Sequence, residues 1–270
     1  MDDPASPSQA YPWRLFWLLL IAAILSALSI IPIAFDMLDA VVAKIEVPNI
    51  SLPLLLAVGV VQNLAILAFV VWLGLKLSRR LGLRAPLLES WVNGSNPSTD
   101  SSARVGKIVR SGLRVGIPVG IILLMSLLVL VPRLPNLPFV IAARLPVWKR
   151  FLACFYGGIY EELLTRLFLL SLVAWIVNRS WRKTAPELSN SAFWFANILV
   201  AVLFGLGHLP STSFFMPITP LVVAAALMLN GIAGIAFGYL YRKHGLEAAM
   251  IAHFTGDFVI YVVGPTFLRR

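Results

Sequence analysis

The sequence predicts an all-α protein, a polytopic transmembrane helical bundle of about 7–8 spans. Of the 270 residues, 59% are hydrophobic and only 13% are charged, whereas a soluble domain is nearer half apolar and a quarter charged. The mean hydropathy is +0.88. Several uncharged runs also reach the length of about 20 residues that a spanning helix needs. Composition and run length therefore agree on an integral multi-pass membrane protein.

Seven segments are predicted to cross the membrane. They are residues 15–35, 47–75, 115–132, 151–178, 191–209, 220–241 and 246–268. Pro210, Pro217 and Pro220 divide the long apolar run that contains the fifth and sixth spans. An eighth element, residues 134–151, mixes basic and apolar residues, which favours an amphipathic helix at the membrane surface.

The net charge of +10 does not indicate nucleic-acid binding, because the basic residues lie at the ends of apolar segments, as the positive-inside rule describes. A polar segment at 89–105 has basic residues on both sides: Lys76, Arg79, Arg80, Arg84, Arg104, Lys107, Arg110 and Arg114. This loop and the N-terminus are therefore expected in the cytoplasm, and the loops at 179–183 and 242–243 agree. Four basic residues fall on the non-cytoplasmic side of the membrane and count against this topology: Arg133, Arg144, Lys149 and Arg150.

These features suggest two parts of the chain. Residues 1–114 are expected to form a two-span region with the polar cytoplasmic loop, and residues 115–270 a core that carries the functional residues. The expected location is the plasma membrane of a bacterium.

The fourth span contains an acidic pair, Glu161 and Glu162, with Arg166 one helical turn beyond. A charged side chain at bilayer depth costs about 2.5–3.5 kcal/mol, so such residues need a partner or a use. Glu162 and Arg166 are four apart and can pair on one helix face. Glu161 then remains as a candidate general base. The structural alternative is an interhelical ion-pair network that only fixes the packing.

Two of the three histidines also lie in predicted spans. His208 ends the fifth span in a glycine-rich setting, and His253 lies one turn before Asp257 in the last span. An isolated membrane histidine is more often a hydrogen-bonded packing residue. Polar groups on three spans together indicate a site. His244 is expected to be solvated, and the single cysteine, Cys154, is expected to be a packing residue.

The ordered motifs Glu-Glu-x-x-x-Arg, Phe-x-x-x-His and His-x-x-x-Asp resemble the CPBP, or Abi, intramembrane proteases, which include the type II CAAX prenyl endopeptidases. The resemblance covers about residues 151–266. It implies that Glu161 and His208 hold and activate the attacking water. It also implies that His253 and Asp257 face the scissile carbonyl, and that Glu162 with Arg166 orients the cluster.

Three questions stay open in the sequence. The family motif has asparagine or aspartate at the position of Asp257, and an asparagine donates a hydrogen bond there, which an ionised aspartate cannot do. Asp257 must therefore be protonated, orient His253, or bind a cation. The cofactor is undetermined: His208, His253 and one carboxylate would suit a divalent metal such as zinc, and a metal-free site is the alternative. The seven-span topology also puts His208 and His253 at different depths, so either the chain re-enters after His208 or a span boundary is wrong.

The expected function is therefore an intramembrane endopeptidase of the metalloprotease-like CAAX type. Its partners would be the lipid bilayer and a peptide or membrane-anchored substrate, with lipid-modified substrates included. The alternatives are a proton-coupled transporter, which would use the same titrating residues, and a non-catalytic immunity or scaffold protein.

Overall fold

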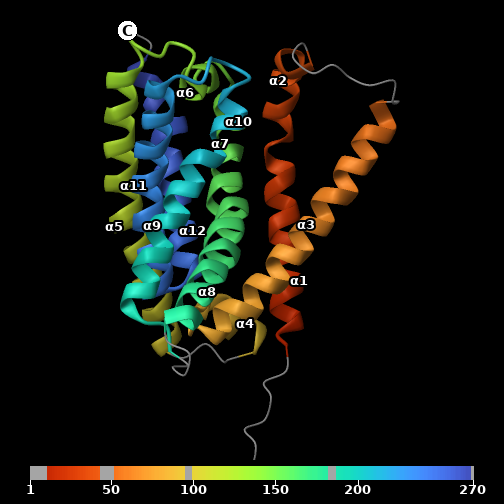
Figure 1. Ribbon diagram of the computed structural model, residues 1–270, viewed down its shortest axis with the longest axis vertical. Coiled ribbons are helices and arrows are strands. Elements are labelled where there is room, and N and C mark those ends of the chain that lie inside the picture. Colours follow the sequence, from red (N-terminus) through yellow and green to blue (C-terminus); the bar gives the residue numbers. More distant parts are fainter. Residues whose placement is uncertain (1–10, 43–51, 95–98, 182–186, 269–270) are drawn as a thin grey trace, which may run out of the picture.

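The computed structural model describes residues 11–42, 52–94, 99–181 and 187–268, and within these residues the structure is helical without strands. Figure 1 shows the long helices side by side as a bundle, with α1 to α3 on one flank. The elements are α1 (Trp13–Ser29), α2 (Ile31–Val42), α3 (Leu52–Arg80), α4 (Pro86–Val92), α5 (Thr99–Leu130), α6 (Pro138–Ala142), α7 (Val147–Phe155), η1 (Tyr156–Glu161), η2 (Leu163–Leu170), α8 (Ser171–Trp181), α9 (Asn190–Gly207), α10 (Leu209–Thr212), α11 (Pro220–His244), α12 (Leu246–Asp257), η3 (Phe258–Val263) and η4 (Gly264–Phe267).

The predicted polytopic helical bundle is confirmed. Within the described ranges, six helices have the length and composition to cross a membrane: Trp13–Asp36, Ala57–Arg80, Ser102–Leu130, Asn190–Thr212, Pro220–His244 and Leu246–Phe267. Each coincides with one predicted span. The remaining predicted span, 151–178, lies in the continuous helical run from α7 through η1 and η2 to α8. Parts of several predictions lie outside the described residues, namely the N-terminus at 1–10, residues 47–51 of the second span, 95–98 of the polar loop and 182–183 of the loop at 179–183.

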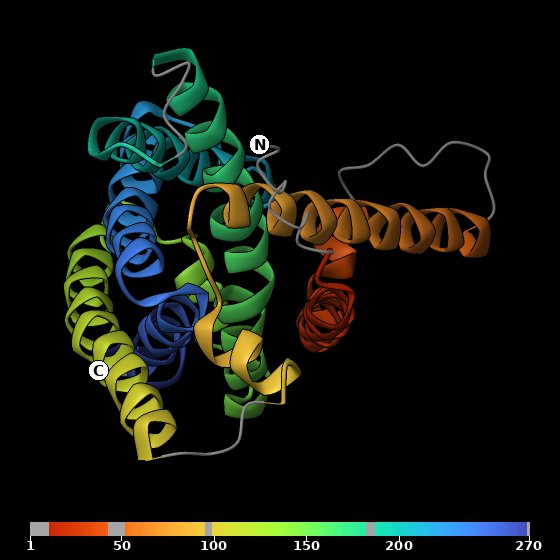
Figure 2. The same ribbon diagram turned by 90° about the horizontal axis from the view of Figure 1, so that it is seen from below.

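Three glycines bring α5 and α12 into close backbone contact. Gly112, Gly116 and Gly120 lie four residues apart and so share one face of α5. A Cβ atom at Gly116 would lie 2.5 Å from the carbonyl oxygen of Ala252, and one at Gly112 would lie 2.7 Å from Ile251. Small residues at such spacing allow membrane helices to approach closely. Figure 2 shows the result, with α12 enclosed between α5 on one side and the α7–α8 run on the other.

The expected surface helix at 134–151 forms two short pieces, α6 and the first turns of α7. Its basic side chains are not all at the surface. Lys149 Nζ binds the Asp36 carboxylate at 2.6 Å and the carbonyl of Pro32, which ties α7 to α2. Arg150 is only 3% exposed and donates to the backbone carbonyl of Tyr261. The alternation of charge predicted a helix here but not that Arg150 points into the bundle.

Candidate functional site within the membrane bundle

The ion pair predicted within the fourth span is present and fully buried. Arg166 Nη1 lies 3.1 Å from Glu162 Oε1, and the two side chains are 2% and 0% exposed. The geometry follows from the four-residue spacing, which puts both side chains on one helix face. A buried ion pair is tolerable only when further groups satisfy its remaining hydrogen-bonding atoms.

Arg166 has those further partners. Its guanidinium donates to the Thr165 hydroxyl and, at 3.2 Å, to the carbonyl oxygen of Gly234 on α11. The rings of Phe204 and Phe237 lie 5.3 and 5.7 Å from the guanidinium carbon, within the range of cation–π attraction. The arginine therefore connects η2 with α9 and α11 at the centre of the bundle.

His253 joins this ion pair from α12. Its Nδ1 lies 2.7 Å from Glu162 Oε1. Because an ionised carboxylate only accepts hydrogen bonds, Nδ1 carries the hydrogen and donates it. Glu162 therefore holds the imidazole through Nδ1, and the other ring nitrogen, Nε2, faces away from the ion pair.

Two further carboxylates lie beside that second nitrogen. Nε2 of His253 is 3.6 Å from Glu161 Oε2 and 3.7 Å from Asp257 Oδ2. Both distances exceed a direct hydrogen bond, and a separation of this size is one that a water molecule can bridge. Glu161 and Asp257 are partly accessible, with side-chain exposures of 20% and 16%. One of the three roles open to Asp257 was to orient His253. Because Glu162 already binds Nδ1 of His253, Asp257 does not orient the ring through that nitrogen.

Gly157 allows this close approach. A Cβ atom at Gly157 would collide with Asp257 Oδ2 and lie 3.1 Å from His253 Nε2. Its neighbour Gly158 similarly faces the Phe254 backbone and Cβ. The residues around the acidic pair also form π-helical turns, η1 and η2, a geometry that is frequent at functional sites. Sequence reasoning missed both glycines, although the pair stands only three residues before Glu161.

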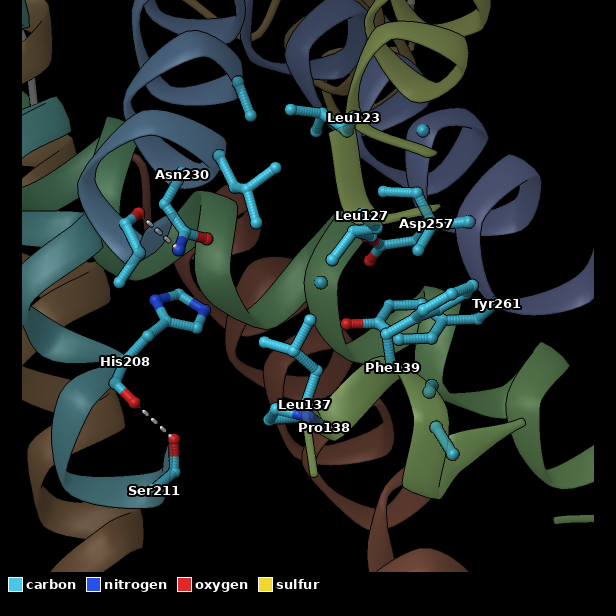
Figure 3. Close-up of a pocket in the computed structure, with 18 of the residues that line it drawn as sticks. Leu123, Leu127, Leu137, Pro138, Phe139, His208, Ser211, Asn230, Asp257 and Tyr261 are labelled. Atoms are coloured by element: carbon cyan, nitrogen blue, oxygen red, sulfur yellow. Dashed lines mark hydrogen bonds between the residues drawn. The ribbon is translucent and has the colours of Figure 1, made fainter. Parts of the chain in front are cut away.

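His208 enters the same cavity from the end of α9. Its Nδ1 lies 2.7 Å from the Phe204 carbonyl oxygen, so Nδ1 donates and Nε2 is left with its lone pair. Figure 3 shows the ring of His208 directed into the cavity, on the side opposite Asp257. The two histidines therefore reach one cavity, and the chain after His208 forms the short helix α10.

The cavity has a volume of about 350 Å³ and mostly apolar walls. Glu161, His208, His253 and Asp257 line it together. Sequence reasoning did not single out Asn230, which also lines it from α11. Its Nδ2 donates to the Ala226 carbonyl at 2.9 Å, and Figure 3 shows its amide oxygen turned toward the cavity. A lone asparagine in an apolar span gave no motif that would have identified it.

The side chains do not fit a metal ion. Among the residues that the structure describes, no three His, Cys, Asp or Glu side chains are grouped so that they could hold one. His208 and His253, the two ligands that the sequence suggested, both line the cavity, and Nδ1 of each is hydrogen-bonded, so only Nε2 of each could serve as a ligand. No chemical step is therefore assigned to a metal.

A buried Glu–Arg–His cluster that opens into a cavity within a helical bundle defines an integral membrane protein with a polar site at membrane depth. Residues 143–259 match the family model of the type II CAAX prenyl endopeptidases, described as Rce1-like. This segment contains all six predicted site residues, and the match supports the resemblance to the CPBP (Abi) family. No curated protein and no solved structure gives a significant match.

Proposed function

We propose that the protein is an intramembrane endopeptidase that hydrolyses a peptide bond in the cavity of the bundle. The observation that carries this proposal is the convergence of Glu161, His208, His253 and Asp257 on one cavity with apolar walls. Three helical segments supply these groups, and a separate ion pair fixes the orientation of one of them.

Glu161 is the proposed general base. It accepts a proton from water while the water oxygen attacks the scissile carbonyl carbon. Nε2 of His208, whose lone pair is free, accepts a hydrogen bond from the same water on the other side of the cavity. A base of this kind must lie within hydrogen-bonding reach of the proton it removes, either directly or through one water.

His253 and Asp257 are proposed to lie beside the carbonyl oxygen of the substrate. A protonated carboxyl group donates a hydrogen bond, whereas an ionised carboxylate only accepts one. With Glu161 ionised and Asp257 protonated, Asp257 donates a hydrogen bond to the oxyanion. The C–N bond then breaks, and the departing amine takes up the proton that Glu161 received.

The substrate is proposed to be a peptide or a membrane-anchored protein. The apolar walls of the cavity suit an extended hydrophobic segment, and they also suit a lipid-modified one. The name of the matching family refers to prenylated CAAX proteins, and that specificity is not required by the residues of the cavity.

Cleavage of a library of membrane peptides by the purified protein tests this function. The wild type is expected to cleave a subset, while Glu161→Gln is expected to lose at least 100-fold in rate. Glu187→Gln, which changes an exposed carboxylate away from the cavity, is the matched control and should keep full activity. All three proteins must unfold at similar temperatures.

Equal cleavage by the wild type and Glu161→Gln would remove Glu161 as the base. Absence of cleavage by the folded wild type would instead favour the transporter or scaffold alternatives. A pH-gradient-driven flux in proteoliposomes would separate those two.

A further inference from the structure

We infer that the cavity opens on the non-cytoplasmic side of the membrane, so that the substrates are exported or membrane-anchored polypeptides whose scissile bond lies on that side. The orientation rests on the geometry and charge of the bundle. The choice of substrate also rests on the proposed endopeptidase function.

The cavity reaches only one end of the bundle. From His253 and Phe237 in the interior it extends to Pro138 at the start of α6 and to Ser211, which is exposed, in α10. Figure 1 shows α6 and α10 at the same end, opposite α4. We call the end of the bundle with α6 and α10 the α6–α10 end, and the opposite end the α4 end.

The α4 end is closed beneath the cavity. Tyr241, Leu246 and Ala249 lie there, and each is at most 1% exposed. No residue that lines the cavity comes from the described residues of 76–114 or 240–249. A polypeptide on the α4 side therefore meets packed side chains and not an entrance.

Exposed basic side chains are concentrated at the α4 end. Within the described residues they are Arg14, Lys76, Arg80, Arg84, Arg104, Lys107, Arg110, Arg114, Arg179 and Lys243. Basic residues near the ends of membrane helices determine the orientation of a multi-pass protein and are retained in the cytoplasm. The α4 end is therefore cytoplasmic.

The basic residues near the α6–α10 end weaken this orientation less than the sequence suggested. Lys149 is bound to the Asp36 carboxylate at 2.6 Å, which neutralises its charge. Arg150 is 3% exposed and points inward to the Tyr261 carbonyl. Arg133 and Arg144 are then the exposed basic residues that the structure describes at this end.

Cysteine labelling in intact cells tests the orientation. In a Cys154→Ala background, which removes the single native thiol, one cysteine is introduced either at the α6–α10 end (Asn136→Cys) or at the α4 end (Ser102→Cys). Both positions are exposed and outside the cavity lining. A membrane-impermeant maleimide is expected to label Asn136→Cys in intact cells and Ser102→Cys only after permeabilisation. The reverse pattern, or equal labelling of both, would overturn the inference.

The side of the substrate is tested in sealed right-side-out membrane vesicles. A water-soluble peptide that the purified protein cleaves is added outside, with vesicles of Glu161→Gln as the control. Cleavage by wild-type vesicles is expected without permeabilisation. Cleavage that appears only after permeabilisation would overturn the inference while leaving the proposed endopeptidase intact. The expected labelling pattern combined with no cleavage of any peptide would instead overturn the proposed function and the choice of substrate, and leave the orientation standing.

Discussion

At the scale of single residues, Glu162 is the centre of the site although it does not line the cavity. One of its oxygens, Oε1, receives both the Arg166 guanidinium at 3.1 Å and His253 Nδ1 at 2.7 Å. The other oxygen, Oε2, is buried without a hydrogen-bond partner among the described residues. The adjacent Glu161 has the opposite environment, since it lines the cavity and is 20% exposed. Of these two neighbouring carboxylates, Glu162 thus belongs to the buried ion pair, and Glu161 is the proposed general base.

This division predicts different effects for the two alanine variants. Glu162→Ala leaves Arg166 buried without its carboxylate, and breaking a buried pair costs about 3–5 kcal/mol. Glu161→Ala removes no buried partner and is expected to change the free energy of unfolding by less than about 1 kcal/mol. Denaturant unfolding in detergent measures both. Equal losses of stability would contradict the division.

At Asp257 the proposed role predicts that hydrogen-bond donation, not charge, is needed. Asp257→Asn keeps a donor at the same position, so it is expected to retain activity within about tenfold of the wild type. It should also lose the decline in rate at high pH that loss of the Asp257 proton produces in the wild type, because an amide keeps its donor. Asp257→Leu, which has no donor, is expected to lose at least 100-fold. Rate profiles from pH 5 to 9 measure this, and an inactive Asp257→Asn with native stability would contradict it.

The sequence predicted the contacts that lie within one helix and not those between helices. The spacing of Glu162 and Arg166 is sufficient to predict their pair, because positions four apart share a face. The hydrogen bond from His253 to Glu162 depends on how α12 packs against η1, and a single sequence does not carry that information. The resemblance to a known family supplied the grouping of the three spans, but it did not identify Glu162 as the partner of His253.

At the scale of elements, α12 is positioned by glycines on two neighbours. The stripe on α5 lies against one side of it, and Gly157 and Gly158 of η1 lie against another. The expected boundaries of α5 also differ from those observed. The predicted span began at 115, whereas the helix begins at Thr99, because its first turns are basic and an apolar-run criterion detects only the part at membrane depth.

Gly157→Ala is expected to displace α12 from η1. The added methyl group would collide with the Asp257 carboxylate, and overpacking of this kind costs about 1–3 kcal/mol. Because a displacement of about 1 Å can cost up to 100-fold in rate, cleavage should fall by at least tenfold.

Gly231→Ala on α11 is the matched control for that variant. A Cβ atom there would meet nothing within 4 Å, and a helical Gly→Ala change into free space stabilises by up to about 1 kcal/mol. If Gly157→Ala were as active and as stable as Gly231→Ala, the close approach would have no functional role.

At the scale of the whole molecule, apolar run length was enough to predict the bundle. The six observed spans coincide with predicted ones because a bilayer imposes a minimum length that is visible in the composition. The suggested division after residue 114 falls within α5, and it stays a prediction. A cavity between the helices was expected, but most of its lining was not predictable, because its walls combine residues from α2, α5, α6, α7, η1, α9, α10, α11, α12 and η3.

The arrangement of the whole cavity predicts that hydrolysis does not require a divalent metal. The histidines and carboxylates that face the cavity are not grouped as a ligand set in the part of the chain described by the structure. Activity should therefore stay within about twofold after dialysis against a strong chelator, since removal of a catalytic metal would abolish it. Loss of cleavage that returns on addition of zinc would contradict this prediction.

The glycine contacts of α12 have a consequence for which step limits the rate of the proposed reaction. A helix held at backbone contact distance on two sides cannot rotate or slide without separating α5 or η1 from it. In the proposed reaction, His253 and Asp257 are therefore already in position before a substrate arrives. Such a site spends little free energy on reorganisation during the reaction. The barrier should then be set by entry of the peptide and by bond cleavage, with no helix movement between them.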